Sequence, residues 1–167
     1  MALFAFQQDY GTMPDFETIA KVRESTGSSL SMGKKSSNDF FRQLFATGMT
    51  ESESMFYARI PGVRKQDGQI SGTKALEKGE CGFTYFLGAI KDCHPARPTV
   101  VVPMIPGTDR FDPEPFGGKA FVLRADNSVT SLVIDKQGHA IFRGKNLMDP
   151  SQEIWEGKPP AIAWPDL

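Results

Sequence analysis

The first third of the chain carries apolar residues at helical spacing, which predicts a series of helices. Residues 2–10 form an apolar helical run, and Gly11 stands where a helix C-cap would. Asp15 is placed to cap a second helix over residues 16–26, which Gly27 ends. We therefore expect two short helices before the first polar loop.

A third helix has a clear amphipathic pattern. It follows a loop rich in Ser, Gly and Lys over residues 28–37; Ser37 can cap this helix, and Gly48 ends it. Its apolar side consists of Phe40, Phe41, Leu44 and Phe45. Thr50 and Glu53 then have the spacing of a capping box, in which the hydroxyl and the carboxylate each bind a free backbone N–H. This box predicts one more short helix, which carries Met55, Phe56 and Tyr57.

Beyond Ile60 the pattern changes to short β-type runs separated by turn residues. Most of the 12 prolines and 16 glycines lie in this part. One further helical turn is expected over residues 73–78, before Gly79. We expect strands over residues 83–87, 99–105, 119–124, 128–134 and 139–142. Pro103 places the second of these strands at a sheet edge or a bulge.

Turn residues determine how the strands connect. The segment 125–127 contains Asp and Asn, which tolerate left-handed backbone, and this predicts a β-hairpin. A second turn over 135–138 adds a third strand, so that the three form an antiparallel meander. From Arg143 onward we expect an extended tail that contains several prolines. Its apolar anchors are Ile154, Trp155, Ile162 and Trp164.

These elements predict an α+β fold, with an N-terminal helix and short helices packed on a small antiparallel sheet. The length of 167 residues favours a single domain. Its parts are residues 1–10 (the end of a longer spine helix), 11–80 (helical), 81–142 (antiparallel sheet) and 143–167 (tail). The apolar opening has no helix cap, so we expect the first helix to continue upstream.

Composition and charge exclude some classes of protein. The 19 basic and 20 acidic residues give a net charge of −1, without the basic excess on which nucleic-acid binding depends. Hydrophobic residues make up 40%, an ordinary value for a globular chain, so disorder is not expected. No stretch approaches the roughly 18 apolar residues that a membrane span needs.

Acid–base chemistry has few candidate residues. His94 stands beside Pro95, and His139 stands at the start of a predicted strand. Neither lies in a recognisable catalytic motif, although histidine is the usual acid–base residue near neutral pH. We therefore expect both histidines to be surface or turn residues, and we predict no catalytic residue and no enzymatic activity.

Cys81, Cys93 and His94 are metal-ligand types that lie close in the sequence. Three residues at this spacing fall short of the four ligands of a structural zinc site. A disulfide between Cys81 and Cys93 would contribute on the order of 3 kcal/mol in the chain-entropy model. Two buried free thiols are the other interpretation, and the sequence leaves both open.

Asp109, Asp112 and Glu114 form an acidic segment that can supply oxygen ligands to calcium. The segment lacks the EF-hand pattern and contains stiffening prolines, so a solvated loop is the simpler interpretation. We assign no metal ligand and no cofactor. Trp155 and Trp164 can line a ligand groove, but aromatic residues in such a tail more often attach it to the domain.

Several phrases of the sequence, taken in order, resemble prepilin-type proteins, the family of type II secretion pseudopilins and type IV pilins. Tyr10 and Gly11, followed by Pro14, resemble the point at which a pseudopilin's long helix ends. The other matching phrases are residues 37–45, 56–58, 79–83, 103–107, 119–129, 149–150 and 154–158. The usual Asp-Gly turn of the closing strand pair is Asp126-Asn127 here.

The resemblance implies a structural subunit. In the family, a basic leader, a cleavage site before Phe, a nearby Glu and an apolar helix come first; here they would precede Ala2. That helix anchors the subunit in the inner membrane and then packs with other pilin or pseudopilin subunits. The head lies in the periplasm or on an extracellular filament. Some pseudopilins bind calcium in their β-region, which makes Asp109 and Asp112 the residues to test.

An alternative function uses the same anchor. The chain would then be a membrane-anchored surface adhesin or a carbohydrate-binding module, with Trp155 and Trp164 as the aromatic residues that contact the ligand.

Overall fold

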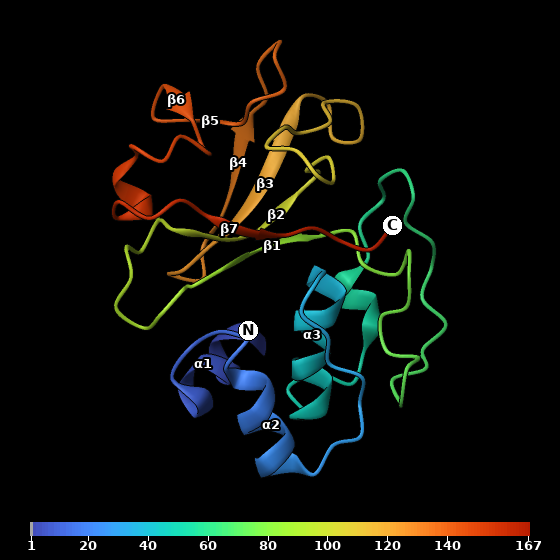
Figure 1. Cartoon of the computed structure of the whole chain (residues 1–167). Coiled ribbons are helices and arrows are strands. Elements are labelled where there is room, and N and C mark those ends of the chain that lie inside the picture. The colour runs from blue at the N-terminus through green and yellow to red at the C-terminus, as the bar shows by residue number, and fades with distance from the viewer. Residues whose placement is uncertain (1) are drawn as a thin grey trace. The chain divides into compact units, whose positions relative to one another are not determined.

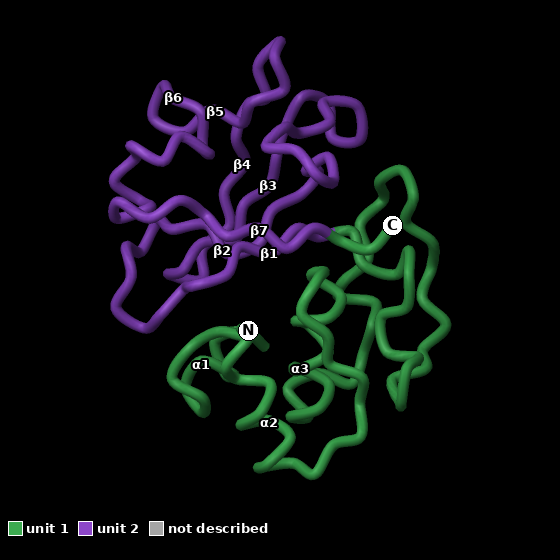
Figure 2. Tube along the Cα trace, in the orientation of Figure 1, with its two compact units in different colours: residues 1–82, 165–167 green, residues 83–164 purple. Residues whose placement is uncertain are grey.

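The chain forms two compact units in the computed structural model, which describes residues 2–167. The helical unit comprises the chain up to Gly82 together with Pro165–Leu167, and the sheet unit comprises Phe83–Trp164 (Figure 2). The division falls where the sequence predicts the change from helices to strands. No helix within the described residues combines the length and apolar character that crossing a membrane requires.

The first two helices lie close to their predicted positions. α1 spans Ala2–Tyr10, and the N–H of Gly11, at φ +81°, closes it on the carbonyl of Gln7. α2 spans Thr18–Thr26 and ends at Gly27 in the left-handed conformation. It begins two residues later than the sequence predicts, because the Asp15 carboxylate binds the N–H groups of residues 17 and 18 in a turn that precedes the helix.

α3 spans Ser37–Ala46, and its cap is Ser36 rather than the predicted Ser37. The Ser36 hydroxyl accepts from the N–H of Asp39 (3.3 Å), and the Asp39 carboxylate accepts from the N–H of Ser36 (3.2 Å). This reciprocal pair is a capping box that uses Asp. The predicted apolar side is confirmed as buried: Phe40, Phe41, Leu44 and Phe45.

The capping box predicted at Thr50 and Glu53 is wrong. The short 3-10 helix η1, Glu53–Phe56, is capped by the Ser52 hydroxyl, which accepts from the N–H of Ser54. The Glu53 carboxylate instead points into the helical unit, where the residue is 2% exposed. The predicted helical turn over residues 73–78 is a series of turns, and residues 57–82 contain no helix or strand.

The sheet unit contains a five-stranded antiparallel sheet in the order β4-β3-β2-β1-β7 (Figure 1). Its strands are β1 (Thr84–Leu87), β2 (Pro98–Val102), β3 (Lys119–Arg124), β4 (Val129–Val133) and β7 (Ala161–Ala163). The predicted β3–β4 hairpin is confirmed, and Asn127 holds the left-handed φ of +67° that its turn requires. β2 is a central strand and not an edge strand, and its bulge lies near Pro98. Pro103 does not interrupt the strand, because β2 ends at Val102.

The chain after β4 departs from the predicted meander. Only an isolated bridge joins Ile134 to Ala140, and β5 (Ile141–Phe142) pairs with β6 (Lys145–Asn146) in a separate two-stranded sheet. The 3-10 helix η2, Glu153–Trp155, follows. The predicted extended tail is partly a strand, because β7 completes the sheet against β1.

The core of the sheet unit lies against one face of the sheet. Along β3, Ala120 and Val122 point into it, while Phe121 between them points outward. The buried cluster consists of Phe86, Val101, Met104, Phe111, Ala120, Val122, Leu132, Ile134, Ala140, Phe142, Leu147, Met148, Ile154 and Trp155. Residues from 140 to 155 therefore supply much of this core, although most of them lie outside regular strands.

Candidate functional site

The two histidines organise turns. The Nδ1 atom of His94 accepts from the N–H of Ala96 (3.1 Å), and the backbone N–H of His94 donates to Glu156 (3.2 Å). His139 lies 3.5 Å from the Asp135 carboxylate, which also accepts its backbone N–H. That N–H is the main cause that lowers the pKa of Asp135. Both imidazoles thus have positions that fit the predicted turn roles.

No disulfide joins Cys81 to Cys93 in the structure. Cys81 is buried in the helical unit, with its sulfur 3.8 Å from the hydroxyl of Ser37. Cys93 belongs to the sheet unit and is half-buried, and burial raises the pKa of its thiol. A raised pKa lowers the thiolate fraction, which disfavours both nucleophilic and metal-binding roles for Cys93.

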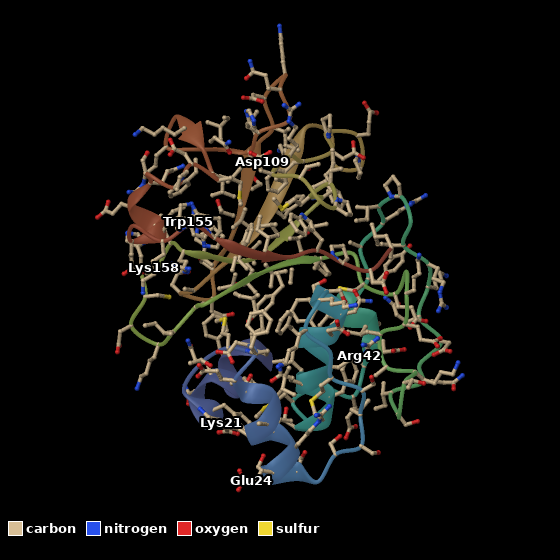
Figure 3. All side chains as sticks on the ribbon, viewed as in Figure 1. Lys21, Glu24, Arg42, Asp109, Trp155 and Lys158 are labelled. Carbon is tan, nitrogen blue, oxygen red and sulfur yellow. The ribbon has the colours of Figure 1, made fainter. Side chains whose placement is uncertain are left out.

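The acidic segment considered for calcium forms a local turn. The Asp112 carboxylate accepts from the backbone N–H of Glu114 (3.0 Å), while Asp109 and Glu114 are exposed. Figure 3 labels Asp109. The carboxylates that the structure brings together are those of Glu53, Asp67 and Glu80, whose ligand atoms lie within 4.8 Å of one another.

This acidic cluster (Glu53, Asp67 and Glu80) holds the irregular segment 63–80 of the helical unit. Both Glu53 oxygens accept backbone N–H groups, from Leu76 at 2.7 Å and from Gly68 at 2.9 Å. The buried Glu80 carboxylate accepts from the N–H groups of residues 67 and 77. This carboxylate also forms an ion pair with the half-exposed Arg64, at 2.9 Å. The two glutamates therefore satisfy four backbone N–H groups of a segment that has no helix or strand.

Burial raises the pKa of Glu53. The neighbouring carboxylates of Glu80 and Asp67 add to that rise, and the backbone hydrogen bonds from Leu76 and Gly68 oppose it. Oxygen ligands of this kind suit a hard divalent cation. However, the four oxygens of the two buried glutamates already accept backbone hydrogen bonds, which gives the cluster a structural role without a metal.

Little in the sequence indicates the acidic cluster. Glu53 has the spacing of a helix cap, and its partners lie 15 and 23 residues further along the chain. Glu80 stands beside Gly79 in a turn-rich stretch. The one usable signal is the position of Glu53 two residues before the apolar run that begins at Met55.

The two tryptophans attach the tail to the sheet unit. Trp155 is fully buried, packs edge-on against Phe86 at 5.5 Å, and donates from Nε1 to the carbonyl of Leu147 (2.8 Å). Trp164 is half-buried and donates to the carbonyl of Thr108 (3.1 Å). A buried ring cannot stack on a sugar, so Trp155 does not support the carbohydrate-binding alternative.

The outer face of the β3–β4 hairpin is apolar and exposed. Val129 is 67% exposed, Val133 is 66% exposed and Phe121 is 39% exposed. Leu123 lies opposite Val129 on this face, and Phe116 packs edge-on against Phe121 at 5.5 Å. We call these five residues the hairpin face. Because β4 ends the sheet order, the face also borders a sheet edge.

Comparison with known protein families, with curated proteins and with solved structures finds no match to this chain. Its function therefore has to be inferred from its own residues and geometry.

Proposed function

We propose that the chain is a non-enzymatic structural subunit of a type II secretion pseudopilus or a type IV pilus-like assembly. The observation that carries the proposal is the hairpin face, in which Phe121, Val129 and Val133 are exposed apolar side chains on a regular strand pair. Exposed apolar side chains that gather on one face of a domain mark a site of interaction with another protein or a membrane. The proposed partners are other pilin or pseudopilin subunits.

The composition of the hairpin face suits a contact between subunits. Lys119 lies opposite Val133, and Ser131 lies opposite Phe121, so polar side chains interrupt the apolar ones. Protein–protein interfaces likewise combine apolar side chains with polar ones. The driving force for assembly would be burial of Phe121, Val129 and Val133.

The N-terminal part of the chain fits the same proposal. α1 buries Ala2, Leu3 and Phe6 within a single short helix, and Gly11 ends it where a pseudopilin's spine helix ends. In the proposed protein, the apolar anchor helix of the family would lead into α1. The head would then lie in the periplasm or on an extracellular filament, with inner-membrane anchoring through that helix.

The experiment that tests the proposal uses the complete gene product in its native cell. Filaments are sheared, and the chain is measured in the filament fraction for the wild type and for Val129→Thr/Val133→Thr. Threonine keeps the β-branched shape and removes apolar surface. We expect the double variant to fold and to be lost from filaments. A matched Ser131→Thr variant, on the same strand, should be retained. Equal recovery of all three would contradict the proposal.

A further inference from the structure

The segment Pro165–Leu167, which follows β7, belongs to the helical unit (Figure 2). The backbone of Asp166 is bound at both of its polar groups. Its N–H donates to Oδ1 of Asn38 (3.0 Å), and its carbonyl accepts from the N–H of Gly79 (2.6 Å). Pro165 is buried and Asp166 is exposed. We call Pro165–Leu167 the strap.

Asn38 is the side chain that receives the strap. It lies in α3, is 1% exposed, and donates from Nδ2 to the carbonyls of Leu76 and Glu77, both at 3.1 Å. Its Oδ1 accepts the N–H of Asp166. Because a buried amide oxygen without a donor is costly, Asn38 favours an N–H group at this position, whichever chain supplies it.

Gly79 and Gly62 allow the strap to come close to the backbone. The carbonyl of Gly79 accepts from the N–H of Arg64 (2.8 Å), so the two polar groups of Gly79 bind different segments. At Gly62 a Cβ atom would lie 3.3 Å from the Cβ of Leu167. Both glycines hold a left-handed φ, +85° at Gly62 and +80° at Gly79, which disfavours a side chain at either position.

These contacts are of the kind that recognises an extended peptide. Main-chain hydrogen bonds supply affinity without regard to the side chain, and places for particular side chains add specificity. Here the main-chain bonds are those of Asp166, and the side chains in place are Pro165, which is buried, and Leu167, which is half-buried beside Gly62. The chain tethers the strap, and a tether of this kind corresponds to an effective concentration on the order of millimolar.

We propose that the place where the strap lies is a docking site for an extended Pro-Asp-Leu segment, and that the strap of a second copy occupies it in exchange for the chain's own. The strap itself is the argument for this occupant, because the same segment would make the same contacts. Exchange keeps each of these hydrogen bonds and loses only the tether. The inference is independent of the proposed function, because it uses no residue of the hairpin face.

The test first frees the docking site from its own strap. Asp166→Pro removes the N–H that Asn38 accepts, and Asp166→Ala is the matched control, because it keeps that N–H. ¹H–¹⁵N NMR of the full chain follows the backbone amide of Gly79 and the side-chain amide of Asn38. We expect Asp166→Pro to shift both signals and to speed hydrogen exchange at Gly79 about tenfold. Asp166→Ala should leave both near their wild-type values.

Binding from outside the chain is then measured with an unlabelled peptide of residues 161–167, added to labelled Asp166→Pro. We expect the Gly79 and Asn38 signals to shift saturably, while the amide of Gly27, which closes α2, stays in place. A peptide that carries the Asp166→Pro change lacks the donor and should bind about tenfold more weakly. The wild-type chain should need at least about tenfold more peptide than Asp166→Pro, because its own strap competes.

Exchange between copies is measured with an unlabelled Asn38→Ala chain, whose strap is intact but has lost its acceptor. Mixed with labelled Asp166→Pro, it should shift the Gly79 signal as the peptide does, and unlabelled Asp166→Pro at the same concentration should not. The proposal is overturned if the peptide of residues 161–167 leaves the signal in place, or if the peptide with the Asp166→Pro change moves it equally. It is also overturned if a folded Asn38→Ala chain leaves the signal in place. If Asn38→Ala does not fold, the two peptides decide.

Discussion

The Oε1 atom of Glu53 accepts a 2.7 Å hydrogen bond from the backbone N–H of Leu76, 23 residues further along the chain. Its other oxygen accepts from the N–H of Gly68. One buried side chain thus fixes two points of a long segment without helix or strand. Since buried N–H groups without a partner are costly, the order of this segment depends on Glu53.

Replacing Glu53 with alanine should destabilise the chain. The buried N–H of Leu76 and the part-buried N–H of Gly68 lose their acceptor, and a buried group costs about 1–3 kcal/mol when it is left unsatisfied. Urea unfolding measures the change. Glu51→Ala is the matched control, because Glu51 is exposed two residues away, and its effect should stay within about 0.5 kcal/mol. A similar effect for both variants would refute the role given to Glu53.

The stability that Glu53 provides should fall as pH rises. Burial raises the pKa of Glu53 above its ordinary value of 4.5, so the folded chain holds this proton more tightly than the unfolded chain does. Between 4.5 and the raised pKa, the folded state binds more protons, and stability therefore decreases with increasing pH. The lowered pKa values of Asp126, Asp135 and Asp149 act in the opposite direction near their own ordinary value of 3.8.

The difference in unfolding free energy between the wild type and Glu53→Ala reports mainly on the acidic cluster, because the carboxylates that do not interact with Glu53 cancel. We expect the difference to be largest below pH 4.5 and to shrink as pH rises, before it levels off. A difference that grows with pH over the same range would mean that the Glu53 pKa is lowered.

Removing the α3 cap should weaken the helical unit. Ser36→Ala deletes the hydroxyl that binds the N–H of Asp39 and should cost about 0.5–2 kcal/mol. Ser31→Ala is the control in the same loop, because the Ser31 side chain is exposed and its backbone N–H, which the substitution keeps, donates to the carbonyl of Gly72. Thermal unfolding compares the two variants. Equal midpoints would show that the Ser36–Asp39 pair does not cap α3.

The two tryptophans should differ in their effect on stability. Trp155→Phe removes the donor to Leu147 in the core and should cost about 1–3 kcal/mol, because a buried carbonyl loses its partner. Trp164→Phe removes a longer bond at a half-buried position and should cost less than about 1 kcal/mol. Chemical denaturation of both variants checks the order, and the reverse order would contradict the core position of Trp155.

Local patterns predicted the elements whose stabilising contacts are local. The bounds of α1 and β3 are as the sequence indicates, and the Asp126–Asn127 turn forms the hairpin. The α3 cap was misplaced by one residue, since adjacent serines are equivalent until the backbone decides which one is extended. In each case the decisive contacts lie within a few residues.

Contacts distant in sequence were missed for a physical reason. The role of Glu53 depends on backbone groups 15 and 23 residues away, and the place of β7 depends on pairing with β1. Similarly, the guanidinium of Arg97 lies over the ring of Trp155, which is 58 residues further along the chain. No periodicity of the sequence encodes such pairs. The α+β class was predictable because it follows from the order of the elements.

The most direct test of the proposed assembly is site-specific photo-crosslinking at the hairpin face in the native cell. A photoreactive residue replaces Val129 in the complete gene product, and Lys136, exposed on the next turn, serves as the control position. We predict crosslinks from position 129 to another pilin-like subunit, at much higher yield than from position 136. If position 129 gives only uncrosslinked chain, or the same products as position 136, the hairpin face is not a subunit contact and the proposed function loses its support.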